Sequence, residues 1–190
     1  MARRIDGKPG CSIELMSTAA AKMWVYAESQ FACIKINGRA NFTSSIDFKT
    51  LLQELLLKGF TCLVLDLSEC TLMDSTFLGV LTGFGLKTSS TKTPRENATI
   101  ELLNPNERIL ELLDSLGVLH LFKLATKHVE VPDLTQAQAV TPCNPTKEEV
   151  TRNCLEAHRT LIQMNPQNAA KFKEVAAFLA EDLKKTKPSL

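Results

Sequence analysis

Residues 63–81 read LVLDLSECTLMDSTFLGVL, and this stretch decides the fold class. Its first part belongs to the run 61–67 (TCLVLDL), which is apolar at nearly every position, as in a central parallel strand covered on both faces. A short polar segment follows, and a helix is predicted from about Asp74 to Lys87. This order of buried strand, polar turn and helix is typical of a βα unit in an α/β domain.

Four more segments are predicted to be strands. Residues 23–29 and 31–37 alternate apolar and polar side chains, as a pair of adjacent strands would. Residues 99–103 and 121–125 are shorter segments of the same kind. Strands separated by helices at this spacing indicate an α/β domain with a largely parallel sheet and right-handed crossovers.

Two amphipathic helices are predicted between these strands. The first begins at Ser44, its expected N-cap, and its apolar stripe ends at Gly59. The second follows Asn104, its expected N-cap, and Pro105, and it ends at Gly117. Each helix is expected to bury its stripe against the sheet.

The chain divides into four predicted segments. Residues 1–21 lack periodicity and are expected to form a flexible leader, and residues 22–127 contain the α/β domain. Residues 128–146 contain three prolines and little periodicity, which indicates a linker. Residues 147–185 carry two apolar helical stripes, which predict a helical hairpin. Because the hairpin cannot bury both stripes alone, it must dock on the α/β domain, on another subunit or on a partner.

The composition limits the classes of function. Lysine and arginine number 22, and aspartate and glutamate number 21, so nothing favours nucleic-acid binding or electrostatic attachment to membranes. The longest apolar runs are far shorter than the roughly 20 residues of a membrane span, and no secretory signal is recognisable, so a cytoplasmic location is expected. The six cysteines are expected to be free thiols. Cys154 and His158 have ligand spacing, but two ligands are too few, so neither a metal nor a cofactor is expected.

Residues 63–81 also resemble the signature of STAS domains of the anti-sigma factor antagonist type. That signature is a hydrophobic strand, an Asp-Ser-Ser or Asp-Ser-Thr turn and a helix. The resemblance extends upstream to IKINGRANFTSSIDFKTLLQELL and downstream to NPNERILELLDSLGVLHLFKL, so that about residues 22–126 are covered. It implies a mixed sheet flanked by helices in a βα superhelix, and the predicted C-terminal hairpin lies beyond the resemblance as an extension.

In this family, the serine directly after the aspartate is phosphorylated by a partner that is both anti-sigma factor and kinase. The resemblance places this role on Ser75, with Thr76 as the alternative acceptor and Asp74 as a flanking partner contact. A phosphate adds a charge of about −1.5 to −2, and beside the Asp74 carboxylate it would release the partner by repulsion. The alternative reading of these residue types is that one of them merely caps the helix.

Three further residues are expected at the partner-binding surface. Arg39 and Asn41 lie in the loop after the second strand, which borders the docking surface in the family. Phe77 stands where many members have glycine, and it either anchors the partner or packs on the domain's own core. In the same helix, Gly79 and Gly83 share a face, which indicates close packing or flexibility there.

The predicted function is that of a regulatory binding protein and not an enzyme. It would capture an anti-sigma factor with serine kinase activity and so release a sigma factor for transcription. A phosphatase, and a homodimer formed through the hairpin, are further partners left open. The family also supplies an alternative, an accessory subunit of a lipid or anion transport system that binds an ATPase or permease. An enzyme would need a base and an oxyanion site beside a serine or cysteine, and none is recognisable.

Overall fold

The computed structural model describes residues 20–90, 98–125 and 137–186, so the predicted leader, 1–21, lies almost entirely outside it. Six strands form one sheet in the described part, in the order β5-β4-β3-β2-β1-β6. Their bounds are β1 (Lys22–Glu28), β2 (Phe31–Ala40), β3 (Cys62–Met73), β4 (Thr99–Leu103), β5 (Lys123–Leu124) and β6 (Gln138–Ala139). Neighbours from β2 to β5 are parallel, and β1 is antiparallel to β2 and β6. The predicted mixed, largely parallel sheet is confirmed.

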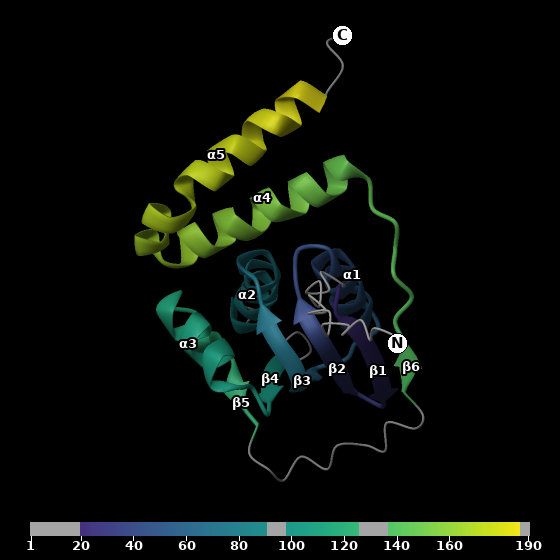
Figure 1. Ribbon diagram of the computed structural model, residues 1–190. Helices are drawn as coiled ribbons and strands as arrows, with labels where there is room; N and C mark the ends of the chain where they lie inside the picture. Colours follow the sequence, from purple (N-terminus) through teal and green to yellow (C-terminus); the bar gives the residue numbers. More distant parts are fainter. Residues whose placement is uncertain (1–19, 91–97, 126–136, 187–190) are drawn as a thin grey trace, which may run out of the picture.

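Helices α1 and α2 lie side by side on one face of the sheet, and α4 lies across their ends (Figure 1). The described helices are α1 (Ser44–Leu57), α2 (Ser75–Ser90), α3 (Glu107–Ser115), α4 (Lys147–Met164) and α5 (Ala169–Thr186), with the 3₁₀ turns η1 (Leu119–Leu121) and η3 (Pro166–Asn168). Within the described ranges, none of them has both the length and the apolarity that crossing a membrane requires.

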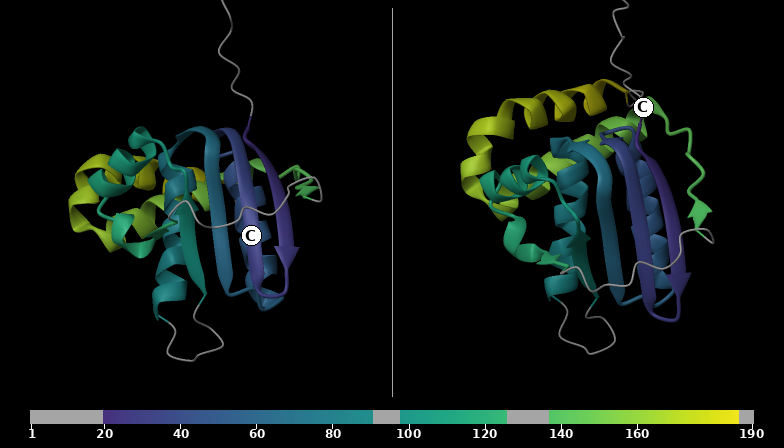
Figure 2. Two further views of the ribbon diagram at one scale, coloured as in Figure 1. Left: turned by 90° about the horizontal axis from the view of Figure 1, so that it is seen from below. Right: turned by 60° about the horizontal axis from the view of Figure 1, so that its bottom comes forward.

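The two faces of the sheet are buried to different extents. On the helix side, alternate residues of β2 and β3 belong to the main core: Ala32, Ile34, Ile36, Leu63, Leu65 and Leu67. The other face carries a smaller cluster around Cys33, Val64 and Leu103. The run 61–67 is therefore central, as predicted, but α1 and α2 both cover the same face (Figure 2). A continuous apolar run predicts that both faces of a strand are buried, but it does not predict which helix or loop covers each face.

Two helix starts are capped by residues other than the predicted ones. The first turn of α1 is capped by Asn41, whose Oδ1 accepts from the backbone N–H of Ser44 at 3.2 Å. The cap of α3 is Asn106, whose Oδ1 accepts from the backbone N–H of Ile109 at 3.0 Å. Asn104 instead has a φ of 52° and lies in the preceding turn. The geometry of the loop decides which of several suitable residues caps the helix, and the apolar periodicity of the sequence does not predict that geometry.

Part of the interval predicted as a linker belongs to the sheet. β6 pairs with β1 at one edge, and the backbone N–H of Val140 donates to the carbonyl oxygen of Met23 at 2.9 Å. Further along, the backbone N–H of Cys143 donates to Oδ1 of Asp47 at 2.8 Å. These contacts guide the chain along the domain to the start of α4.

The C-terminal hairpin docks on its own α/β domain. In Figure 1 the arrowheads of β2 and β3 point toward α4, and α5 packs on the outer side of α4. Leu155, Ala157 and Leu161 of α4 are buried. The side chain of Asn168 donates to the carbonyl oxygens of Leu116 at 3.0 Å and Leu161 at 2.9 Å, which ties the turn of the hairpin to the end of α3. Of the three predicted docking sites, the described structure shows the α/β domain.

Candidate functional site

Asp74 connects the start of α2 to the loop between β2 and α1. Its Oδ1 accepts from the backbone N–H of Phe77 at 2.8 Å, as an N-cap does, and its Oδ2 accepts from that of Phe42 at 2.7 Å. The backbone N–H of Asp74 donates to the carbonyl oxygen of Ala40 at 2.9 Å. The capping interpretation therefore holds for Asp74, whose carboxylate holds two segments of the fold together.

Ser75 is the first residue of α2, and its hydroxyl faces α4. Ser75 Oγ lies 3.0 Å from Nε2 of His158, a residue 83 positions later in the chain. Nδ1 of the same imidazole lies 2.8 Å from the carbonyl oxygen of Cys154. Because a carbonyl only accepts, Nδ1 carries a proton and donates to it, and Nε2 is left to share a hydrogen bond with the Ser75 hydroxyl. The residue predicted to carry the phosphate thus has a partner in the hairpin.

Thr76 is more deeply buried than Ser75 and faces the same helix. It is 4% exposed, and its hydroxyl donates to Sγ of Cys154 at 3.7 Å. Burial raises the pKa of the Cys154 thiol, which favours its protonated form. The position of Thr76 inside the α2–α4 contact makes it a poorer acceptor and a poorer partner contact than Ser75.

Phe77 packs on the domain's own core. It is 0% exposed, and its ring stacks on that of Phe48 with the centroids 4.5 Å apart. Of the two readings for Phe77, core packing is correct. The reading as a partner anchor is wrong for this structure, because no part of the ring is accessible.

Arg39 and Asn41 lie beside the triplet because β2 and β3 end together. In the parallel pairing, Arg39 is opposite Leu72 and Ala40 is opposite Met73. Arg39 is exposed, whereas Asn41 is half-buried and uses its side-chain oxygen to cap α1. The fold thus brings the predicted contact residues to one end of the sheet, and partner contact through Arg39 stays a prediction.

Sequence reasoning missed the hairpin's part in this site. Cys154 and His158 are four residues apart, a spacing that in the sequence alone resembles half of a metal site. Among the described residues, no group of three or more His, Cys, Asp and Glu side chains is placed to hold a metal ion. The helical spacing instead brings the two side chains to Thr76 and Ser75 of α2.

The pair of Ser75 and His158 lacks the geometry of a hydrolytic triad. Nδ1 of His158 faces a carbonyl oxygen of its own helix, where a triad has a carboxylate. His158 is 6% exposed, and its ring packs against Phe172 with the centroids 5.1 Å apart. Ser75 itself is half-buried, and its hydroxyl faces a buried imidazole that α4 supplies.

A family model described as the STAS domain matches residues 24–131 of the chain. The search of curated proteins found no match to this chain. The match ends before α4 begins at Lys147, so the hairpin that covers Ser75 lies outside the matched region.

Three solved structures illustrate the similarity of the fold. An anti-sigma factor antagonist from Mycobacterium paratuberculosis is 14% identical, with a TM-score of 0.50, and the match covers 60% of this chain and 92% of that one. The anti-sigma factor antagonist SpoIIAA in its unphosphorylated form is 15% identical, with a TM-score of 0.46, and the match covers 60% of this chain and 96% of that one. The Bacillus cell fate determinant SpoIIAA in its phosphorylated form is 16% identical, with a TM-score of 0.42, and the match covers 55% of this chain and 92% of that one.

Proposed function

Since the chain belongs to the STAS domain family, we propose that it acts as an anti-sigma factor antagonist. In this role it captures an anti-sigma factor and so releases a sigma factor for transcription. The partner is an anti-sigma factor with serine kinase activity, and phosphorylation of Ser75 ends the capture. The protein itself acts by binding and not by catalysis.

The observation that carries this proposal is the position of Asp74, Ser75 and Thr76. The triplet stands where β3 ends and α2 begins, and the sequence resemblance assigns the phosphorylated serine of the family to Ser75. In open α/β sheets, ligands are recognised beyond the carboxyl ends of the parallel strands. The loop with Arg39 and Asn41 reaches the same end of the sheet from β2.

The start of α2 suits a charge switch. Backbone N–H groups of a first helical turn and the positive end of the helix dipole tolerate an anion there. Directly before Ser75, the Asp74 carboxylate is held in place by the N–H groups of Phe42 and Phe77. A phosphate of charge about −1.5 to −2 adds to this fixed negative charge, and a partner surface that accepts a neutral serine is then repelled. We expect release of the partner and not unfolding of the domain.

Incubation with ATP and the serine kinases of the histidine-kinase-like class encoded near its gene is expected to place one phosphate on Ser75. Mass spectrometry of peptides locates the phosphate. Ser75→Ala should abolish the signal, because the acceptor oxygen is removed. Thr76→Val should keep it, because valine preserves the shape of this buried side chain. Phosphate on another residue, or none with any of these kinases, would refute the switch at Ser75.

Ser75→Asp is expected to weaken capture of the anti-sigma factor at least tenfold, which corresponds to about 1.4 kcal/mol. The added carboxylate lies beside Asp74 and imitates part of the phosphate charge. Ser75→Ala should bind within about twofold of the wild type, since it adds no charge. Titration calorimetry measures both affinities, and circular dichroism verifies the fold. Equal affinities of Ser75→Asp and wild type would show that repulsion does not control the capture.

A further inference from the structure

Helix α4 occupies the surface around the first turn of α2. His158 lies 3.0 Å from the Ser75 hydroxyl, and Cys154 lies 3.7 Å from the Thr76 hydroxyl. Figure 1 shows α4 crossing the end of α2, with α5 above α4 on the side away from the sheet. Both hydroxyls of the triplet therefore face the hairpin, and α4 covers part of the half-buried Ser75 that a kinase must reach.

The two helices touch at Gly79, one turn after Ser75. A Cβ atom built on Gly79 would lie 2.5 Å from the backbone oxygen of Ala157, a distance that real Cβ atoms essentially never show. Of the two readings given for this face, close packing or flexibility, close packing is correct at Gly79. At Gly83 the nearest atom to such a Cβ is a methyl carbon of Thr160 at 3.9 Å, which is an ordinary contact. Two glycines of one helix thus differ sharply in how closely α4 approaches them.

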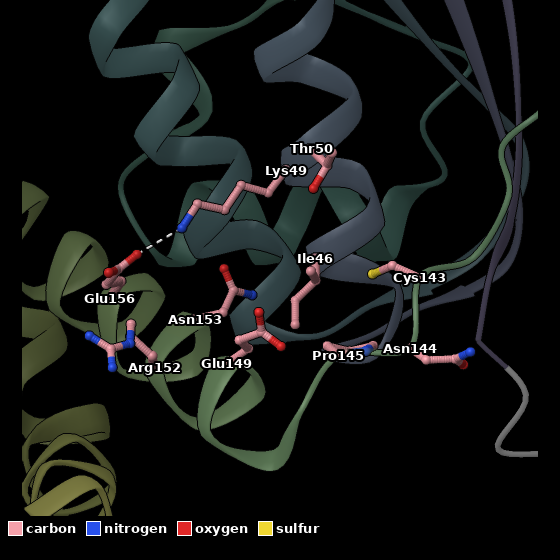
Figure 3. Close-up of a pocket in the computed structure, with 10 residues that line it drawn as sticks. All are labelled: Ile46, Lys49, Thr50, Cys143, Asn144, Pro145, Glu149, Arg152, Asn153 and Glu156. Atoms are coloured by element: carbon pink, nitrogen blue, oxygen red, sulfur yellow. Dashed lines mark hydrogen bonds and ion pairs between the residues drawn. The ribbon is translucent and has the colours of Figure 1, made fainter. Parts of the chain in front are cut away.

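Toward α1, the contact between the hairpin and the domain is polar and incompletely filled. A pocket of about 400 Å³ opens between α1 and α4 (Figure 3). Nζ of Lys49 forms an ion pair across it with Oε2 of Glu156 at 2.8 Å. A smaller pocket of about 130 Å³ lies beside Gly79 and Ala157. Fewer dispersion contacts hold α4 here than in a close-packed core.

Asn153 adds a cost to the docked position of α4. It is 5% exposed, and its Nδ2 donates to Oγ of Ser45 at 2.8 Å. The hydroxyl of Ser45 donates to the carbonyl oxygen of Phe42 at 2.6 Å, so the amide of Asn153 cannot be reversed. Its Oδ1 has no hydrogen-bond partner among the described residues. Water would reach this oxygen if α4 moved away, so its desolvation counts against docking.

We propose that the α4–α5 hairpin is a displaceable cover that competes with the partner kinase for the first turn of α2. With the hairpin docked, the Ser75 hydroxyl is bound to His158 and partly covered. With the hairpin undocked, Ser75 is open to the partner while the α/β domain stays folded. The identity of the competitor rests on the proposed function, whereas the covering of Ser75 rests on the contacts of α4 alone.

Phosphorylation and docking of the hairpin oppose each other in this geometry. Phosphorylation replaces the hydroxyl proton of Ser75, whose oxygen lies 3.0 Å from Nε2 of His158, by a bulky phosphoryl group, and so removes the contact with the imidazole. Docking of the hairpin and phosphorylation of Ser75 are linked equilibria. If phosphorylation weakens docking by some factor, docking disfavours phosphorylation by the same factor. The hairpin therefore opposes phosphorylation, and phosphorylated protein keeps the hairpin open.

Cysteine labelling at position 75 tests the cover without any partner. Ser75→Cys is introduced into the full chain and combined with Gly79→Ala or with the matched control Gly83→Ala. Both alanines favour α2 equally, but only the first collides with the backbone of α4. A second pair acts from the hairpin: Ala157→Glu puts a charge at the buried contact, and Gln163→Glu puts one on an exposed position of α4. Iodoacetamide labelling is followed by peptide mass spectrometry under reducing conditions.

Labelling of position 75 is expected to be at least tenfold faster with Gly79→Ala and with Ala157→Glu than with their controls. Cys70, which is 2% exposed within β3, should stay unlabelled and report that the domain is folded. Equal rates at position 75 in all variants would overturn the proposal. Labelling of Cys70 together with position 75 would also overturn it. The α/β domain would then unfold whenever the hairpin undocks.

The kinase provides the second arm, with Ser75 restored. Gly79→Ala is expected to be phosphorylated at least fivefold faster than Gly83→Ala. If labelling changes as expected and no variant is phosphorylated, the proposed function fails and the cover stands. If all variants are phosphorylated at one rate despite the change in labelling, competition by the hairpin is refuted and the proposed function stands.

Discussion

Phe77→Ala is expected to destabilise the protein by about 3–5 kcal/mol, the usual loss when a buried phenylalanine is truncated. Phe77 is 0% exposed, and its ring stacks on Phe48, which joins α2 to α1. The surrounding helices and sheet cannot close fully over the space that the ring leaves. Urea unfolding followed by circular dichroism measures the loss.

Phe42→Ala is the matched control for this measurement. Phe42 is 48% exposed in the loop before α1, so its truncation should change stability by no more than about 0.5 kcal/mol. A loss below about 1 kcal/mol for Phe77→Ala would show that the ring is not a core residue in solution.

Asp74→Ala is expected to cost about 2–3 kcal/mol, since it removes an N-cap and a charged acceptor of a second backbone N–H. Its two oxygens bind the N–H groups of Phe77 and Phe42, at 2.8 Å and 2.7 Å. The substitution loosens the start of α2 from the loop after β2. Thermal and urea unfolding should agree on the loss.

Asp114→Ala serves as the control for Asp74, because it removes an exposed carboxylate of α3. It is expected to stay within about 0.5 kcal/mol of the wild type. If Asp74→Ala were equally mild, the carboxylate would be free for a partner and its two backbone contacts would be dispensable. The structural contacts predict the opposite.

Most strands and helices were predictable from local patterns. The alternation in 31–37 and the apolar run 61–67 reported the two central strands, because side-chain direction repeats every two residues in a strand. Gly59 and Gly117 were correctly predicted to end helices, and both have a positive φ, of 86° and 70°. The predicted cap at Asn104 was wrong, because Asn106 lies at the helix start once the turn is formed.

The short edge strand β6 was not predictable in the same way. It consists of Gln138 and Ala139, both exposed, in a segment rich in proline. Such a strand has no apolar alternation of its own, because it buries no face. It forms since β1 presents an unpaired edge to it.

The sequence by itself determined the α/β class, the central strands, the helical hairpin and the position of Ser75 at a helix start. These features follow from periodicity, cap residues and a motif that spans neighbouring residues. Only the tertiary structure decided that the hairpin docks on its own domain, that Phe77 is core and that His158 binds the Ser75 hydroxyl. The physical reason is that local patterns report the burial of a side chain but not its partner. The partner of Ser75 depends on how closely α4 crosses α2. The two helix backbones can come this close because Gly79 has no Cβ atom.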